Sequence, residues 1–132
     1  QLAINEAGIA LEQVDYINTH GTSTPIGDVA EVKAIQDLFG KHAYYINLTS
    51  SKSMTGHILG GTGAVEAIIS ILSMQHGIVT PTINHEEGDE DPNIDYKLNF
   101  TFNQAQQREI RYAMSNNFGF GGHNACLLFK RI

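Results

Sequence analysis

Blocks of β-type and helix-type hydrophobic pattern alternate along the first half of the chain. Residues 1–12 are typical of the end of a helix, and the β-rich run 14–19 predicts a strand. Over residues 28–40, apolar positions recur at helical spacing and predict a second helix that stops at a glycine. Residues 43–49 then predict a second strand. This half therefore has the order helix, strand, helix, strand.

The second half predicts one more helix and a terminal pair of strands. Residues 64–76 are apolar on nearly every side, so we expect this helix to be buried within the protein. Residues 81–92 predict a partly acidic loop, while 111–116 and 125–130 predict two strands. Alternating β and α elements indicate an α/β fold, in which helices cover both faces of a mixed, mostly parallel sheet. The terminal strand pair would add an antiparallel edge.

Composition narrows the class of protein. The chain is 42% hydrophobic and 17% charged, which is typical of a globular rather than a disordered protein. The net charge of -6 is largely local, because six of the 14 acidic residues lie between Glu86 and Asp95. A nucleic-acid-binding surface needs clustered lysine and arginine, and the sequence has no such cluster. We therefore expect no nucleic-acid partner.

Cysteine content and the longest apolar stretch bear on compartment and on nucleophilic chemistry. Cys126 is the only cysteine and lies in an apolar run, so we expect it in the core and not as a nucleophile. The apolar stretch 64–74 is far shorter than the ~18 residues that a membrane span needs. We therefore expect no membrane association and a cytoplasmic location. The chain begins at Gln1 within a helical pattern, so we expect residues 1–132 to be one domain cut from a longer protein.

Three polar loops follow predicted strands. They contain His20, residues 52–57 and residues 118–124. In sheets of this kind the chemistry lies at the carboxyl ends of the strands, so we expect the three loops to converge there. His20 and His57 could be structural hydrogen-bonding residues, or neutral imidazoles that point N–H groups into a shared pocket. With His123 they could nominally bind a metal, but no carboxylate or cysteine accompanies them, and we expect no metal.

Lys52 and Glu66 are the only charged residues in positions 43–67. Lys52 could be solvated, or it could keep a neighbouring histidine neutral and so a hydrogen-bond donor. Glu66 could complement the helix dipole, or it could be a buried partner of Lys52 or of ordered water. Thr22 and Thr24 could be turn residues, or their hydroxyls could bind an amide-bearing substrate arm. The sequence leaves these alternatives open.

Three segments together resemble the signatures of the β-ketoacyl-acyl carrier protein synthases. They are NTHGTSTP at residues 18–25, SKSMTGH at 51–57 and NFGFGGHN at 117–124. Gly27, Asp28 and Glu31 extend the first segment, and the run from Gly63 to Glu66 extends the second. Their order matches the family and they span nearly the whole chain. The resemblance is to the C-terminal portion of the type II, elongating condensing enzymes.

The resemblance implies a fold, a reaction and partners. The fold would be the C-terminal half of a thiolase-like structure, in which two similar halves pack as five αβαβα layers and two subunits form a homodimer. The reaction would be a decarboxylating Claisen condensation with malonyl-acyl carrier protein, which elongates a fatty acyl chain. Substrates would arrive as phosphopantetheine thioesters on acyl carrier protein, with no further cofactor. The nucleophilic cysteine would lie in the N-terminal half, so this chain alone would be inactive.

The resemblance also implies roles for individual residues. His20 and His57 would donate hydrogen bonds to the malonyl thioester oxygen, and Lys52 and Glu66 would support and orient that pair. Thr22 and Thr24 would contact the phosphopantetheine arm. The remaining substrate-binding positions form one turn, in which Phe120 would gate the acyl pocket with its backbone N–H in a second oxyanion hole: Phe118, Gly119, Phe120 and Gly121.

The sequence departs from the family pattern at one position, and two other functions are considered. His123 occupies a position where the family has a small hydroxyl residue, which leaves its role open. A non-catalytic chain-length-factor subunit is an alternative, although such partners are expected to lose active-site residues that are present here. A ketosynthase domain of a modular polyketide synthase is a second alternative. The paired histidines argue against initiating synthases, in which an asparagine replaces one of them.

Overall fold

The computed structural model describes all residues from Gln1 to Ile132. Short 3-10 turns precede β1, β2 and α4, at Leu11–Gln13, Gly40–Tyr45 and Leu59–Gly61. The helices and strands follow in the order α1 (Leu2–Ala7), β1 (Tyr16–Asn18), α2 (Pro25–Phe39), β2 (Asn47–Thr49), α3 (Lys52–Thr55), α4 (Thr62–His76), β3 (Ile78–Val79), β4 (Gln106–Gln107), β5 (Tyr112–Gly119) and β6 (His123–Lys130).

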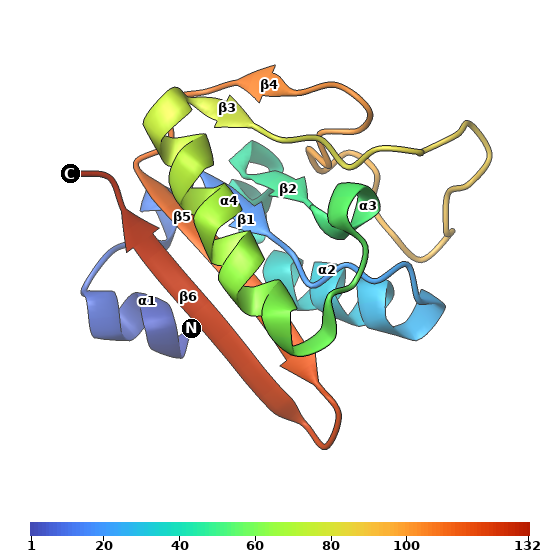
Figure 1. Cartoon of the computed structure of the whole chain (residues 1–132), viewed down its shortest axis with the longest axis horizontal. Coiled ribbons are helices and arrows are strands. Elements are labelled where there is room, and N and C mark those ends of the chain that lie inside the picture. The colour runs from blue at the N-terminus through green and yellow to red at the C-terminus, as the bar shows by residue number, and fades with distance from the viewer.

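A four-stranded sheet with the order β2-β1-β5-β6 forms the centre of the molecule (Figure 1). β1 is parallel to both β2 and β5, whereas β6 returns antiparallel to β5 through a tight turn. β3 and β4 form a separate two-stranded antiparallel ribbon. The prediction of a mostly parallel α/β sheet with antiparallel terminal strands is therefore confirmed.

Alternating side chains divide the core between the two faces of the sheet. In β1, Tyr16 packs with Met74 of α4, while Ile17 packs with Val32 and Ile35 of α2. Figure 1 shows α4 crossing one face of the sheet in front of β1 and β5. The larger core cluster lies on the other face, and its buried members are Ile4, Val14, Ile17, Val32, Ile35, Phe39, Ala43, Ile46, Leu48, Leu98 and Met114.

Several predicted boundaries were wrong, for identifiable local reasons. α2 begins at Pro25, three residues earlier than expected, because Thr24 occupies the N-cap position and proline is favoured in the first helical turn. The strand predicted over residues 43–49 is shortened to β2, because a 3-10 turn runs on from α2 as far as Tyr45. The loop after β2 contains the one-turn helix α3, and the two-residue strands β3 and β4 were missed.

α4 turns its polar side chains inward. Thr62, Glu66, Ser70 and Ser73 are buried, spaced so that they share one face of the helix. The opposite side is apolar and exposed, with Ile68 57% and Leu72 45% accessible, so the expectation that this helix is buried all round is wrong for this chain. None of the helices is long and apolar enough to cross a membrane.

Cys126 is exposed, and the expectation that it lies in the core is wrong. β6 is an edge strand with a hydrogen-bonding neighbour on one side only, and most of its residues are accessible. An apolar run in sequence therefore marked an edge strand here rather than a core strand.

Candidate functional site

The loops that follow β1 and β2 meet at the carboxyl ends of these strands, and the third predicted loop contributes only Phe118 of β5. The ring centroids of His20 and His57 are 5.6 Å apart in an edge-to-face arrangement. The ring of Phe118, near the end of β5, lies 5.3 Å from that of His20. Residues far apart in sequence thus form one cluster of two imidazoles and a phenyl ring.

A buried carboxylate on α2 holds the His20 loop. Glu31 is 5% exposed, and its two oxygens accept hydrogen bonds from the backbone N–H groups of His20 (3.0 Å) and Gly21 (3.1 Å). The side-chain amide of Asn116 donates to the same carboxylate at 3.1 Å. Burial raises the pKa of Glu31 above its ordinary value, although these donors act in the opposite direction. The carboxylate therefore fixes the backbone that carries His20.

Gly21 is required by close packing next to His20. Its φ is +34°, and a Cβ atom at this position would lie 2.7 Å from Cβ of Ser50 and 2.8 Å from Oγ1 of Thr19. No side chain fits without moving the backbone of the β2 loop. The hydroxyl of Ser50 donates to the Gly21 carbonyl at 2.6 Å, which ties the two loops together.

The electrostatic surroundings favour the neutral form of His20. Burial lowers its pKa below the ordinary value of 6.5, and the positive charge of Lys52 and the neighbouring His57 lower it further. A neutral imidazole donates one N–H without carrying charge into the site. His20 Nδ1 is buried and has no hydrogen-bond partner within the chain.

The contacts of His57 select one imidazole tautomer. The backbone N–H of Leu59 donates to Nδ1 at 3.1 Å, so Nδ1 must be the unprotonated nitrogen. The hydroxyl of Thr62 lies 3.1 Å from the same Nδ1. The proton of the neutral ring is therefore on Nε2, which is left free to donate a hydrogen bond.

Lys52 and Glu66 form a buried ion pair next to the histidines. Lys52 Nζ lies 2.6 Å from Glu66 Oε1, and the two side chains are 5% and 1% exposed. The Asn117 amide donates to the other Glu66 oxygen at 3.0 Å, and Ser51 Oγ is 3.4 Å from the first. Of the alternatives left open by the sequence, a buried partner of Lys52 is therefore the one that the structure shows for Glu66.

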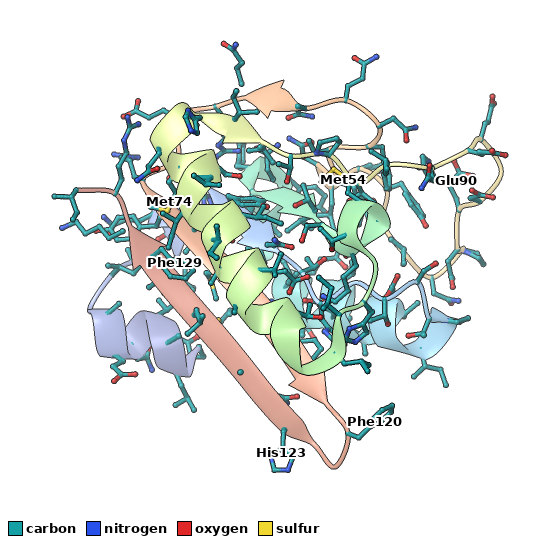
Figure 2. The ribbon with its side chains drawn as sticks, viewed as in Figure 1. Met54, Met74, Glu90, Phe120, His123 and Phe129 are labelled. Atoms are coloured by element: carbon teal, nitrogen blue, oxygen red, sulfur yellow. The ribbon has the colours of Figure 1, made fainter.

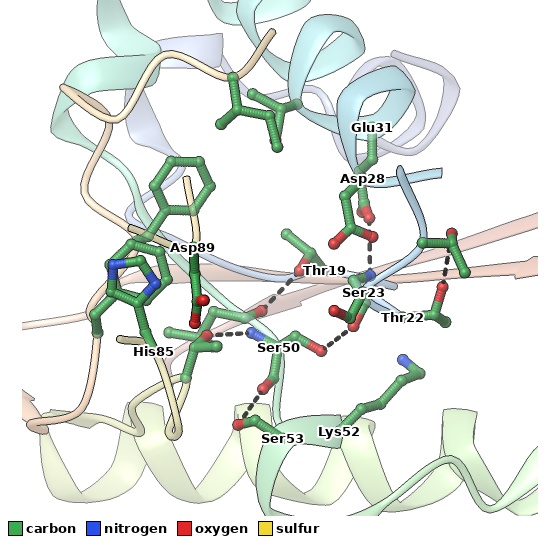
Figure 3. Close-up of a pocket in the computed structure, with 18 of the residues that line it drawn as sticks. Thr19, Thr22, Ser23, Asp28, Glu31, Ser50, Lys52, Ser53, His85 and Asp89 are labelled. Atoms are coloured by element: carbon green, nitrogen blue, oxygen red, sulfur yellow. Dashed lines mark hydrogen bonds between the residues drawn. The ribbon is translucent and has the colours of Figure 1, made fainter. Parts of the chain in front are cut away.

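A cavity of about 610 Å³ adjoins this cluster (Figure 3). Thr22, Thr24, Lys52 and His57 contribute to its lining, whereas His20 does not. The hydroxyls of Thr22 and Thr24 are 3.2 Å apart. The predicted hydroxyls of Thr22 and Thr24, the Lys52 ammonium and the His57 imidazole therefore line one cavity.

The glycine-rich turn is only partly brought to the site. Phe118 contacts His20, but Phe120 is fully exposed at the tip of the β5–β6 hairpin, where Figure 2 also shows His123. Gly119 ends β5 and Gly121, with φ +83°, lies in the turn. No three histidine, cysteine or acidic side chains lie close enough together to hold a metal ion.

Sequence reasoning placed Glu31 and Asn117 within motifs but assigned no role to them, and it missed Asn116. Glu31, Asn116 and Asn117 each accept or donate hydrogen bonds at the site. Neighbouring asparagines at the end of a strand point to opposite faces, which could have assigned one to α2 and one to α4. Thr62, Glu66 and Ser70 follow one another at four-residue spacing in the otherwise apolar helix α4. This spacing could have placed Thr62 on the same face of the helix as Glu66.

Comparisons with protein families and curated sequences show which family the chain resembles. The family described as "Beta-ketoacyl synthase, C-terminal domain" matches residues 1–86. The chain is 52% identical over 132 residues to 3-oxoacyl-[acyl-carrier-protein] synthase 2 of Staphylococcus aureus strain COL, covering 100% of this chain and 31% of that protein. It is 48% identical over 130 residues to the protein of the same name from Coxiella burnetii, covering 98% of this chain and 30% of that one. The chain thus spans about a third of the length of these relatives.

Solved structures show the same fold. A β-ketoacyl synthase from Burkholderia phymatum superposes with a TM-score of 0.90 at 40% identity, covering 100% of this chain and 31% of that chain. A type II polyketide ketosynthase, solved in complex with its acyl-carrier protein and bound to a hexaketide, superposes with a TM-score of 0.92 at 33% identity, covering 99% of this chain and 31% of that chain. These likenesses confirm the thiolase-like fold class. Because the family match covers more than half of its residues, the chain belongs to the β-ketoacyl synthase family and corresponds to its C-terminal domain.

Proposed function

We propose that the chain is the C-terminal part of a 3-oxoacyl-[acyl-carrier-protein] synthase II, an acyltransferase that elongates fatty acyl chains by decarboxylating condensation with malonyl-acyl carrier protein. The observation that carries the proposal is the pair of imidazoles 5.6 Å apart. One of them has its proton on Nε2 and the other has a pKa lowered by burial and by Lys52. Two neutral donors side by side suit an oxyanion that forms during reaction.

The reaction requires stabilisation of an enolate. When the malonyl thioester loses CO₂, the electron pair of the broken C–C bond moves into the thioester and places negative charge on its oxygen. His20 and His57 donate hydrogen bonds to that oxygen. The enolate carbon then attacks an acyl thioester on a cysteine outside these 132 residues, and the cysteine thiolate leaves. Each such donor contributes about 10²–10³ in rate.

The other predicted residues have supporting roles in this proposal. Lys52 disfavours the charged form of His20, and Glu66 neutralises Lys52 and holds it beside the histidines. Thr22 and Thr24 bind the amides of the phosphopantetheine arm in the adjoining cavity. Phe118, Gly119, Phe120 and Gly121 contact the acyl substrate, with Phe120 as the gate. No metal or other cofactor takes part.

The partners follow from the same proposal. Acyl carrier protein delivers both substrates, as one structural neighbour was solved with its own carrier protein. The N-terminal half of the longer protein covers the exposed apolar side of α4, at Ile68, Ile71 and Leu72. The complete protein is a cytoplasmic homodimer. The relatives support a further N-terminal part, because the chain spans only about a third of their length.

A non-catalytic partner subunit is the second candidate. It is favoured by one structural neighbour, a ketosynthase/chain length factor that superposes with a TM-score of 0.90 at 36% identity. The residue at the nucleophile position of the longer protein distinguishes the candidates, because cysteine supports an enzyme and glutamine or alanine a partner subunit. A polyketide ketosynthase domain is separated from a fatty acid enzyme by its preferred acyl substrate.

The central experiment replaces each histidine in the longer protein. His20→Ala and His57→Ala should each lower the rate of malonyl-acyl carrier protein decarboxylation by about 10²–10³, because each removes one donor to the enolate. Acylation of the cysteine should remain measurable. His76→Ala, in the last turn of α4 and exposed, is the matched control and should retain the wild-type rate. Normal decarboxylation in either site variant would remove the role proposed for that histidine.

The isolated chain should have no acyltransferase activity. Residues 1–132 contain no cysteine other than Cys126, which lies on the edge strand β6 and not among the loops of the site, so the chain offers no nucleophilic cysteine there. Incubation with radiolabelled acyl-acyl carrier protein should leave the chain unlabelled. Covalent transfer of the acyl group to the chain would contradict this expectation.

A further inference from the structure

Thr62 is buried against His57, a contact that neither the sequence motifs nor the comparisons assign. It is the first residue of α4 and is 2% exposed, whereas His57 lies in an exposed loop. Thr62 Oγ1 is 3.1 Å from His57 Nδ1. Glu66, one helical turn later on the same face of α4, binds Lys52 at 2.6 Å. The first turn of α4 therefore contacts both the imidazole and the cation of the site.

The hydroxyl of Thr62 is not used by the helix itself. The N-cap of α4 is Gly61, no side chain caps the helix, and His57 is the only hydrogen-bonding partner of the Thr62 hydroxyl. Because Leu59 N–H already points at Nδ1, that nitrogen is an acceptor, and the Thr62 hydroxyl must donate to the same lone pair. A proton on Nδ1 would face the Leu59 N–H and be disfavoured.

The two donors to Nδ1 differ in how firmly they are held. Leu59 is 76% exposed, has a φ of +51° that is unusual for a bulky residue, and precedes Gly60 and Gly61. Its N–H is therefore presented by a short turn with little packing. Thr62, by contrast, is fixed by a 15-residue helix whose inner face is buried.

We propose that Thr62 is a positioning residue for His57. Its hydroxyl anchors Nδ1 to the rigid start of α4, and so keeps the proton on Nε2 and the ring in one orientation. The functional part of this inference rests on the proposed condensing activity, in which Nε2–H is a donor to the enolate. The structural part, the tautomer of His57, does not depend on that activity.

The test uses Thr62→Val, which removes the hydroxyl and retains the branched shape, and Thr62→Ser, which retains the hydroxyl. Both are made in the longer protein labelled with ¹⁵N-histidine. Long-range ¹H–¹⁵N spectra report which nitrogen of His57 carries the proton, and kcat and KM for malonyl-acyl carrier protein decarboxylation are measured in parallel. Thr80→Val is the matched control, because it makes the same change at a buried threonine hydroxyl that has no hydrogen bond to His57.

Thr62→Val should increase the fraction of His57 with its proton on Nδ1 and lower kcat by roughly three- to tenfold, the loss of about one hydrogen bond, with little change in KM. Thr62→Ser should restore both, and Thr80→Val should change neither. A wild-type tautomer distribution or a wild-type kcat in Thr62→Val overturns the positioning role. If Thr62→Val does not fold, the His57 tautomer and kcat are measured in Thr62→Ala instead. Wild-type protein that fails to decarboxylate the substrate would instead overturn the proposed function, while the tautomer spectra still decide the role of Thr62.

Discussion

An ion pair lies at each end of the central sheet, and the two pairs differ in the groups that they contact. Asp15 and Arg108 lie at the amino end of β1, with 3.4 Å between Asp15 Oδ1 and Arg108 Nη2. Lys52 and Glu66 lie beyond the carboxyl ends, 2.6 Å apart and almost completely buried. Each end of the sheet thus has one basic side chain paired with one carboxylate.

The pair at the amino end joins separate segments of backbone. Asp15 Oδ2 accepts hydrogen bonds from the N–H groups of Arg111 and Tyr112, at the start of β5. Arg108 donates to the Asn47 side chain at 2.7 Å and to the Tyr45 carbonyl. These contacts connect β1, β2 and β5, and no imidazole lies among them.

The pair at the carboxyl end leaves one partner facing a cavity and a histidine. Lys52 lines the cavity of about 610 Å³, and its charge adds to the effect of burial, which lowers the pKa of His20. Glu66, by contrast, accepts from Lys52 and Asn117, with Ser51 Oγ 3.4 Å away, and does not line the cavity. The amino-end pair thus joins backbone segments of the sheet, whereas the carboxyl-end pair also places a positive charge beside His20.

The largest expected effect comes from breaking the buried pair. Glu66→Ala leaves the Lys52 ammonium buried without a counter-charge, which should lower the free energy of unfolding by about 3–5 kcal/mol. Urea denaturation of the longer protein measures the change. The double variant Lys52→Met/Glu66→Gln removes both charges and should recover most of the loss. A Glu66→Ala variant as stable as wild type would show that Lys52 reaches solvent.

Asp15→Ala should have a smaller effect of the same kind. It leaves the backbone N–H groups of Arg111 and Tyr112 without their acceptor, which costs about 1–3 kcal/mol. The same denaturation experiment measures it. If Asp15→Ala destabilised the protein more than Glu66→Ala, the greater burial of the carboxyl-end pair would not be the deciding factor.

The sequence was sufficient for the fold class and for the edge of the sheet at which the loops meet. The alternation of β-type and helix-type pattern gave both, because parallel strands place their carboxyl ends together. It was not sufficient for short elements: β3 and β4 have two residues each and carry no periodic pattern. Nor does apolar pattern report how much of a helix is covered, as the exposed Ile68 of α4 shows.

The supporting contacts of the site were beyond sequence reasoning for a different reason. Glu31 reaches the His20 backbone from 11 residues away, and Asn117 reaches Glu66 from 51 residues away. Such partners depend on which helix covers which face of the sheet. Strand alternation limits the choice for Asn116 and Asn117, but only the packed helices decide it.

The smallest expected effect is a shift in the pH dependence of the decarboxylation rate. Only the pair Lys52–Glu66, and not Asp15–Arg108, should change this dependence. In the proposed mechanism His20 acts in its neutral form, so the decarboxylation rate should fall as pH drops through the His20 pKa, which burial and Lys52 hold below 6.5. Removing the Lys52 charge favours the imidazolium form and raises that pKa, so the acid limb of kcat/KM in Lys52→Met/Glu66→Gln should move to higher pH. Asp15→Asn should leave the acid limb in place, because Asp15 is not among the groups that act on His20. Equal acid limbs in wild type and the double variant would mean that Lys52 does not set the charge of His20, and the two ends of the sheet would then differ only in stability.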